Sequence, residues 1–411
     1  MKGRLLLIAS LASRLGVSMG TVLLLARLLP PLQFGLFTTT MSVSYIASLF
    51  ADFGFVIRAL REIGARPETA GTVMTAAIRA KAILSLIVSG IGAAVCIVLP
   101  LSENDLIVVI IVWLATFVNS FGDTALVAFR SLRFFNQEVR VTSMSFAFHI
   151  SIMLAGYFWG LPVLGMACLY LLTRLIYAFA AFRSLAHLCP LVGLLSQDFS
   201  DFFKLLRSSA NYAMDSILTN IFAQLDGLVV PALLGLQAAG IYQAGSRLAQ
   251  GLLLFSGILT TYHIPQMSYE HSLGQLRFGK SGLRAITEFG ALGLIGAVGF
   301  LLGGPIYVSH FLGTSYAGLD YLWPGFAAFV FTRFLASGVG AYLIAHGMSY
   351  IRPLCTFLAG CVTMGLYFFL LPSYGAIAIP WAATIGTAVL MLGYTIIALR
   401  LPYLAENAQR H

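Results

Sequence analysis

Long apolar stretches, most of them exceeding twenty residues, alternate with short polar connections along the whole chain. A helix of about 20 apolar residues crosses the roughly 30 Å hydrocarbon layer of a membrane. The pattern therefore predicts an all-α, polytopic membrane protein with twelve transmembrane helices. The predicted helices span residues 5–29, 35–57, 76–100, 105–129, 141–161, 163–187, 209–234, 240–265, 285–311, 321–346, 351–371 and 374–399.

Positively charged residues are concentrated on alternate connections between these helices. Nineteen of the 24 lysines and arginines lie at the termini, in the even-numbered connections or in the helix turns beside them, among them Arg58, Lys81 and Arg352. Short loops that are rich in Lys and Arg stay in the cytoplasm. We therefore expect both termini and the even-numbered loops to be cytoplasmic and the odd-numbered loops to lie outside.

Composition excludes a water-soluble protein. The chain is 59% hydrophobic and 9% charged, with a mean hydropathy of +0.91, far from the values of soluble domains. The net charge of +9 reflects the loop bias. Nucleic-acid binding is not expected, because the aromatic residues are spread through apolar helices instead of sharing a basic face.

The chain is predicted to consist of two similar halves. The longest polar interruption separates the sixth and seventh helices, and residues 28–37 align with residues 233–242 at a constant shift of 205, with Gly35 on Gly240. Six helices per half give a parallel pseudo-repeat, so we expect two six-helix lobes around a central cleft. The predicted parts are an N-terminal lobe 1–187, a cytoplasmic linker 188–208, a C-terminal lobe 209–400 and a cytoplasmic tail 401–411.

Small residues and one loop motif need a separate interpretation. Glycines at helix-packing spacing, such as Gly299 and Gly303, are predicted to let helices approach closely.

Residues 274–281 (GQLRFGKS) match the phosphate-binding loop pattern, but that loop requires a preceding strand, and here it joins two membrane helices. No catalytic triad, metal cluster or hydrolytic carboxylate pair stands out, so an enzyme and a bound cofactor are not expected.

Charged side chains inside apolar runs are the candidate functional residues. Each costs about 2.5–3.5 kcal/mol on insertion scales, so such residues usually face a bundle interior or a wet cavity. Arginines bind phosphate oxygens in a bidentate manner, and hydroxyl and amide side chains on the same helix faces suit a sugar. The candidate substrate-binding and translocation residues are Arg14, Arg174, Asp215, Asp226, Arg247, Arg333, Asp52 and Asp123.

Several of these charges have an alternative, structural interpretation. Asp52 lies about one turn from Arg58, and Asp123 about two turns from Arg130, so local pairing explains them as well as substrate contact does. Arg174 and Arg247 could clamp neighbouring helices.

Four side chains in the apolar runs carry expectations of their own. Asp215 and Asp226 should share one stripe of a continuous seventh helix, about 16 Å apart. Glu288 is expected to pair with Arg284. His149 fits a hydrogen-bonded packing residue better than a proton relay.

Two segments resemble the signatures of a known family. The first comprises residues 25–37 (LARLLPPLQFGLF), DFGF at 52–55 and REI at 61–63; the second comprises QLDGLVVP at 224–231, LLG at 233–235 and GIYQAGSRL at 240–248. They resemble the segments that open the two halves of bacterial polysaccharide exporters. These are the O-antigen and exopolysaccharide flippases of the Wzx type, in the multidrug/oligosaccharidyl-lipid/polysaccharide exporter superfamily. Asp52, Asp226 and Arg247 match recurrent positions of that family.

The resemblance implies a transporter of the bacterial inner membrane that moves an undecaprenyl-diphosphate-linked oligosaccharide from the cytoplasmic to the periplasmic leaflet by alternating access. It also implies H⁺ or Na⁺ coupling and work beside a polysaccharide polymerase and its chain-length machinery. One alternative is a cation-coupled multidrug antiporter of the same fold, although that would suit a more acidic cavity. A membrane sugar transferase or ligase would require larger outer loops with catalytic side chains.

Overall fold

The computed structural model describes residues 20–98, 102–190, 199–273, 280–348 and 351–408. Within these residues every regular element is a helix, and no strand occurs. Nine described stretches are long and apolar enough to cross a membrane, and two of them, Leu225–Glu270 and Arg352–Arg400, each contain parts of two predicted helices. The expected all-α, multi-pass membrane fold is confirmed.

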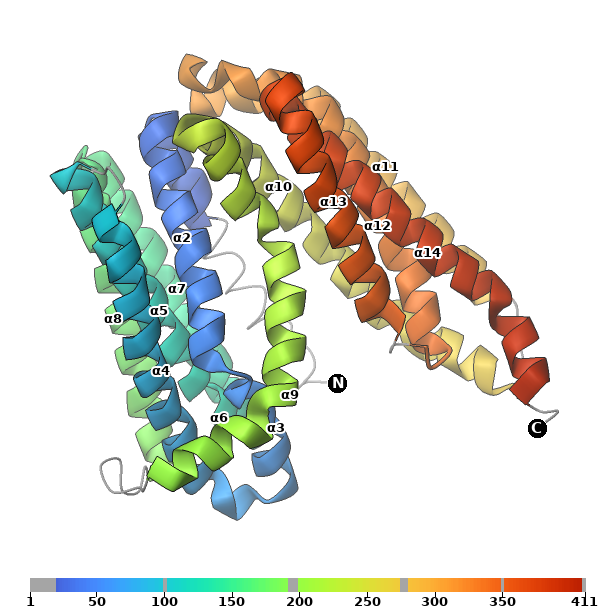
Figure 1. The fold of residues 1–411 in the computed structure, drawn as a ribbon, viewed down its shortest axis with the longest axis horizontal. Coiled ribbons are helices and arrows are strands. Elements are labelled where there is room, and N and C mark those ends of the chain that lie inside the picture. The colour runs from blue at the N-terminus through green and yellow to red at the C-terminus, as the bar shows by residue number, and fades with distance from the viewer. Residues whose placement is uncertain (1–19, 99–101, 191–198, 274–279, 349–350, 409–411) are drawn as a thin grey trace. The chain divides into compact units, whose positions relative to one another are not determined.

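The first compact unit contains the described residues up to Leu29, together with Leu36–Leu228. Within it α5 packs against α8, and α8 against α7 (Figure 1). After a helical stretch at 20–28, its elements are α2 (Pro31–Asp52), α3 (Phe55–Ala65), the 3-10 turn η1 (Pro67–Thr69), α4 (Ala70–Val98), α5 (Glu103–Ala125), α6 (Val127–Ser131), α7 (Phe135–Phe158), α8 (Val163–Leu188) and α9 (Phe199–Ala223).

The second compact unit contains Pro30–Gly35 and the chain from Val229 onward. In this unit α12 packs against α11 and α14, and α13 packs against α14. Its elements are α10 (Leu225–Ser272), α11 (Lys280–Tyr307), η2 (Val308–Leu312), η3 (Thr314–Leu322), α12 (Trp323–Ala345), α13 (Arg352–Tyr374), η5 (Gly375–Ile377) and α14 (Ala378–Ala408). The lobe boundary at 188–208 stays a prediction; α9 begins within that segment and belongs to the first compact unit.

Two glycines of the second unit make a reciprocal contact. A Cβ atom added to Gly35 would lie 1.8 Å from the carbonyl oxygen of Leu236, and one added to Gly240 would lie 2.0 Å from that of Pro31. Pro31 and Leu236 are separated by the same 205 residues as the two glycines. The contact therefore has the reciprocity expected of a repeat-related pair, and backbones approach this closely only where side chains are absent.

A further glycine breaks α10 at the corresponding place in the second half. Gly235 has φ 81° and ψ 171° inside α10, a backbone conformation that is open to glycine but not to residues with a Cβ atom. Its repeat equivalent is Pro30, where the chain turns into α2. The prediction that Gly299 and Gly303 pack against helices is wrong, because added Cβ atoms there would meet nothing within 4 Å.

Two predicted helices are interrupted beside their aspartates. The predicted helix 35–57 ends at Asp52, and Phe53 and Gly54 adopt positive φ before α3 begins. The predicted helix 209–234 breaks at Gln224, where the carboxylate of Asp226 accepts a hydrogen bond from the Gly227 amide at 3.1 Å. Such local side-chain bonds compete with helical ones. The expectation of one continuous helix carrying both Asp215 and Asp226 is therefore wrong.

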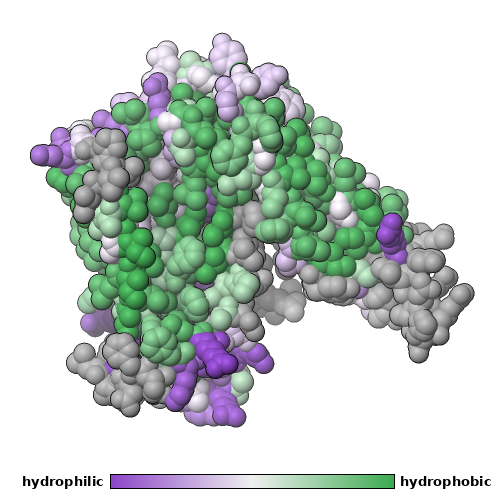
Figure 2. Space-filling view, viewed as in Figure 1, coloured by the Kyte–Doolittle hydropathy of each residue, from purple (hydrophilic) through white to green (hydrophobic). Residues whose placement is uncertain are grey.

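The sides of the helices are covered by apolar side chains, as Figure 2 shows. Leu86, Phe158 and Phe369 are 76%, 79% and 82% exposed. Exposed apolar surface on this scale marks an interaction surface. Together with the spanning lengths, it assigns these helix faces to the lipid.

Candidate functional site

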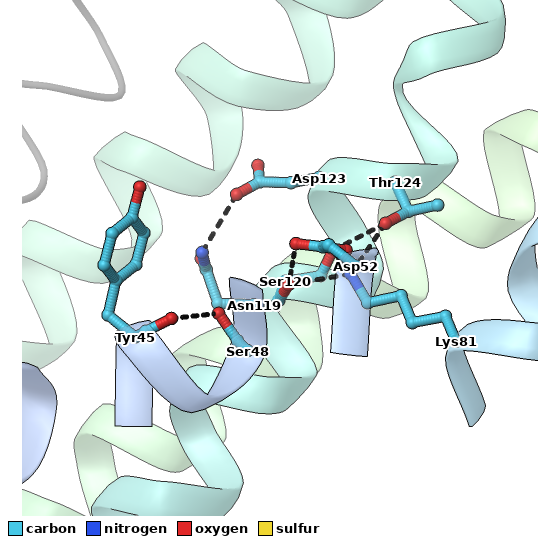
Figure 3. A network of polar contacts seen from close by, with 8 residues as sticks. All are labelled: Tyr45, Ser48, Asp52, Lys81, Asn119, Ser120, Asp123 and Thr124. Atoms are coloured by element: carbon cyan, nitrogen blue, oxygen red, sulfur yellow. Dashed lines mark hydrogen bonds and ion pairs between the residues drawn. The ribbon is translucent and has the colours of Figure 1, made fainter. Parts of the chain in front are cut away.

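A buried lysine occupies the centre of a polar network in the N-terminal unit (Figure 3). Lys81 on α4 is 0% exposed and forms an ion pair with Asp52 at the end of α2. Its ammonium also donates to the carbonyl and hydroxyl oxygens of Ser120, at 2.8 and 2.7 Å, and to the hydroxyl of Thr124 at 2.7 Å. A buried charge is tolerated when it is paired and hydrogen-bonded in this way.

This arrangement corrects two expectations from the sequence. Lys81 was expected among the positive charges at the cytoplasmic boundary, whereas it is wholly buried. Asp52 pairs with Lys81 and not with Arg58, because the turn at Phe53 and Gly54 places Arg58 on α3, where it pairs with Glu62 at 2.6 Å. The sequence does contain a signal, since Lys81 lies five residues inside the predicted helix 76–100.

A second polar group lies on the face of α5 that carries Ser120 and Thr124. Asn119, Ser120, Asp123 and Thr124 share one side of the helix by their spacing. Asp123 accepts hydrogen bonds from the Asn119 amide at 3.1 Å and from the Tyr177 hydroxyl on α8 at 2.6 Å. Two carboxylates, Asp123 on this face and Asp52 at the end of α2, thus lie among neutral hydrogen-bonding groups.

Arg174 joins this group from α8. Its guanidinium donates to the side-chain amide oxygen of Asn119 at 3.2 Å and lies 4.6 Å from the centre of the Tyr170 ring. These contacts fit the helix-clamp interpretation of Arg174.

The local pairing expected between Asp123 and Arg130 is not formed, because Arg130 binds the buried carboxylate of Glu138 at 2.7 Å.

A tyrosine connects this side of α2 to α9. Tyr45, partly exposed at 38%, donates from its hydroxyl to Asn220 on α9 at 3.1 Å. Ser48 donates to the Tyr45 carbonyl at 2.7 Å, so both side chains follow the last turns of α2 toward Asp52 (Figure 3).

His149 is a packing residue, as expected. It is 2% exposed, its Nε2 lies 2.5 Å from the Thr21 hydroxyl, and its Nδ1 lies 2.7 Å from the Thr173 hydroxyl on α8. Two hydroxyl partners satisfy both ring nitrogens, and the residue bridges the first described helix, α7 and α8.

Two arginines of α3, Arg58 and Arg61, form a basic clamp on α9 that lies outside the membrane-spanning segments. On α3, Arg58 donates to the Leu205 carbonyl at 3.3 Å and to the Ser208 hydroxyl at 2.5 Å, and Arg61 donates to the Tyr212 hydroxyl at 2.5 Å. Because the Tyr212 hydroxyl accepts this hydrogen bond, it raises the pKa of Arg61. The contacts tie α3 to α9 within the first unit.

The remaining predicted residues are more dispersed. Arg247 on α10 donates to Gln250 at 3.1 Å, and Arg333 lies partly buried on α12. Asp226 begins α10, so only Asp52, Asp123 and Arg174 of the predicted set are brought together here. Arg14 and the side chain of Asp215 lie outside the described residues. The expected pair of Arg284 and Glu288 is confirmed, at 2.8 Å.

The fold is shared with membrane transporters of known structure. A multidrug resistance MATE family transporter of the MOP superfamily, in an inward-facing conformation, matches 97% of this chain and 99% of its own, with a TM-score of 0.75 and 16% identity. The lipid II flippase MurJ, inward closed, matches 96% and 87%, with a TM-score of 0.71 and 14% identity. A MOP superfamily transporter from Pyrococcus furiosus matches 98% and 95%, with a TM-score of 0.60 and 14% identity.

Sequence comparison identifies the family directly. No curated protein sequence matches the chain significantly. The family model described as "Polysaccharide biosynthesis protein" matches residues 1–269, which is more than half of the chain. With the twelve-helix pattern and the shared transporter fold, the chain belongs to the polysaccharide biosynthesis protein family.

Proposed function

We propose that the protein is a flippase that moves an undecaprenyl-diphosphate-linked oligosaccharide from the cytoplasmic to the periplasmic leaflet. The observation that carries this proposal is the polysaccharide biosynthesis family match, combined with a fold shared by a lipid flippase and a multidrug transporter. A lipid-linked sugar is the intermediate of polysaccharide synthesis that must cross a bilayer, and this fold moves molecules across bilayers.

The charges within the helices give the proposal its chemistry. Arg14 and Arg333, together with Arg174 and Arg247, would neutralise diphosphate or acidic sugar groups. Asp215 and Asp226 would be counter-charges and candidate sites for H⁺ or Na⁺ coupling. Asp52 is neutralised by Lys81, so we assign it to holding the N-terminal unit together, and Asp123 to hydrogen bonding of the passing glycan.

The proposed setting is the bacterial inner membrane with both termini cytoplasmic. The two predicted lobes, 1–187 and 209–400, would alternate access to the two leaflets. A polysaccharide polymerase would consume the flipped product. Reporter fusions in the even- and odd-numbered loops test this topology: active alkaline phosphatase in an even-numbered loop would overturn it.

The test of the function is the fate of the lipid-linked oligosaccharide in cells. A deletion strain should accumulate it in the inner leaflet, and the wild-type gene should restore export. Arg14→Ala and Arg333→Ala should impair export at an unchanged protein level. Wild-type export from both variants would remove these arginines from the mechanism.

The second candidate is a cation-coupled multidrug antiporter. It is favoured by the high fold similarity to the MATE family transporter. Overexpressing cells would then survive cationic drugs at raised concentrations, and deletion would leave polysaccharide export intact. We expect neither result, because a cavity for cationic drugs should be acidic, whereas several arginines lie among the deep charges of this chain.

A further inference from the structure

A long stretch of the C-terminal helices contains partly buried positive charge and no acidic residue. Residues 321–405 include Arg333 on α12 and Arg352 at the start of α13, yet no aspartate or glutamate. The two arginines therefore have no carboxylate partner in their own helices. Every other cationic side chain described above has an anionic or hydrogen-bonding partner.

The two arginines converge on one buried tyrosine. The guanidinium of Arg352 lies 6.0 Å from the ring centre of Tyr394 on α14, which is only 3% exposed. Arg333 interacts electrostatically with both Tyr394 and Arg352. The hydroxyl of Thr356 lies 3.5 Å from that of Tyr394. Two guanidinium groups and two hydroxyls from α12, α13 and α14 thus interact with one another through Tyr394.

This region also contains an unsatisfied donor. The Nε atom of Arg352 is buried and has no hydrogen-bond partner among the described residues. It lies beside Gly340 of α12, since a Cβ atom on Gly340 would be 3.6 Å from it. A buried donor without an acceptor is costly, and two like charges in a medium of low dielectric constant raise that cost.

We propose that Arg333 and Arg352 form a binding site for the diphosphate group of a lipid-linked ligand, with Tyr394 and Thr356 as hydroxyl donors. The choice of ligand rests on the proposed function. An anion would supply the missing counter-charge and the missing acceptor. Each guanidinium presents a planar fork that matches one phosphate group. Two forks therefore favour a diphosphate over the single phosphate of an ordinary phospholipid.

Binding to the purified full-length protein in neutral detergent tests this site. The probes are farnesyl diphosphate, inorganic diphosphate and dioleoylphosphatidylglycerol, which separate a prenyl diphosphate from a free anion and from a phospholipid headgroup. We expect farnesyl diphosphate to bind most tightly. Arg333→Gln and Arg352→Gln should each weaken it at least about tenfold, the loss expected when one charge-assisted interaction is removed.

Two controls separate loss of the site from loss of the fold. Arg284→Gln removes an exposed arginine that is paired with Glu288 and should bind farnesyl diphosphate as the wild type does. Arg352→Lys keeps the charge but loses the fork, and should bind with intermediate affinity. Each variant must elute as a single symmetrical peak in size-exclusion chromatography.

The outcomes bear differently on this site and on the proposed function. Equal binding by wild type and both glutamine variants would overturn the site, as would phosphatidylglycerol binding as tight as that of farnesyl diphosphate. Arginine-dependent diphosphate binding in a protein that moves no lipid-linked oligosaccharide would support the site while contradicting the flippase function.

Discussion

The two units differ in how they accommodate positive charges within their helices. In the N-terminal unit, Lys81 is matched by Asp52 and by the hydroxyls of Ser120 and Thr124. In the C-terminal helices, Arg333 and Arg352 lie in 85 consecutive residues without a carboxylate. A charge that the chain itself neutralises is part of the fold, whereas a charge left without a counter-ion is available to a ligand.

Because of this difference, we expect removal of the charge to lower the free energy of unfolding in the first case and to raise it in the second. Breaking a buried pair leaves the partner uncompensated and destabilises a protein by about 3–5 kcal/mol. Removing a cation that has no internal partner relieves a cost and leaves nothing unpaired. The sign of the change thus separates the two kinds of site.

The largest effect is expected for Lys81→Met. This variant leaves Asp52 without its ammonium partner, so we expect a loss of about 3 kcal/mol and little folded protein by fluorescence-detected size-exclusion chromatography. The double variant Lys81→Met/Asp52→Asn should recover most of the folded protein. Full folding of the single variant would mean that the pair contributes nothing to the N-terminal unit.

A substitution that disturbs packing is expected to destabilise the second unit, whereas removal of an arginine charge there is not. Gly240→Ala places a methyl group 2.0 Å from the Pro31 carbonyl, and we expect a loss of about 1–3 kcal/mol, measured as a lower melting temperature. Gly303→Ala, whose Cβ would meet no atom within 4 Å, is the matched control. Equal melting temperatures for the two variants would show that the close crossing is not required.

Arg352→Gln should shift stability in the direction opposite to Lys81→Met. With no internal acid to leave unpaired, we expect the ligand-free protein to gain up to about 1 kcal/mol, since the buried Nε donor of Arg352 has no acceptor among the described residues and such a donor costs free energy. Thermal unfolding without added phosphate compounds measures the gain. A drop of several degrees would place Arg352 among the structural charges, together with Lys81.

The smallest effect is expected for Arg61→Gln. The hydrogen bond to Tyr212 lies outside the membrane-spanning segments and is exposed to water, where such contacts contribute little. Melting temperature and protein level should stay at the wild-type values. A clear loss would show that the clamp between α3 and α9 is needed for folding.

The sequence predicts the membrane fold well because hydropathy is a local property. The spanning helices follow from runs of apolar residues, and the pair of Arg284 and Glu288 follows from i, i+4 spacing. The glycine crossing could be anticipated because its two members share a repeated segment. Each of these signals lies within a short stretch of the chain or in two similar stretches.

The charge network could not be predicted, because its partners are distant in sequence. Asp52 and Lys81 are 29 residues apart, and Tyr177 reaches Asp123 across 54 residues. These pairs depend on which helices lie next to one another in the fold. The hydropathy pattern does not contain that information. The turn at Gly54 moved Arg58 away from Asp52, and a helix template gives no reason to expect a turn there.

The central claim is tested most directly by reconstitution. The purified protein is placed in proteoliposomes that carry a fluorescent undecaprenyl-diphosphate oligosaccharide in both leaflets, and a membrane-impermeant reagent quenches the outer pool. If the protein is a flippase, quenching should become nearly complete with the wild-type protein, while about half of the signal persists in protein-free vesicles. The same protected fraction in both preparations would contradict it.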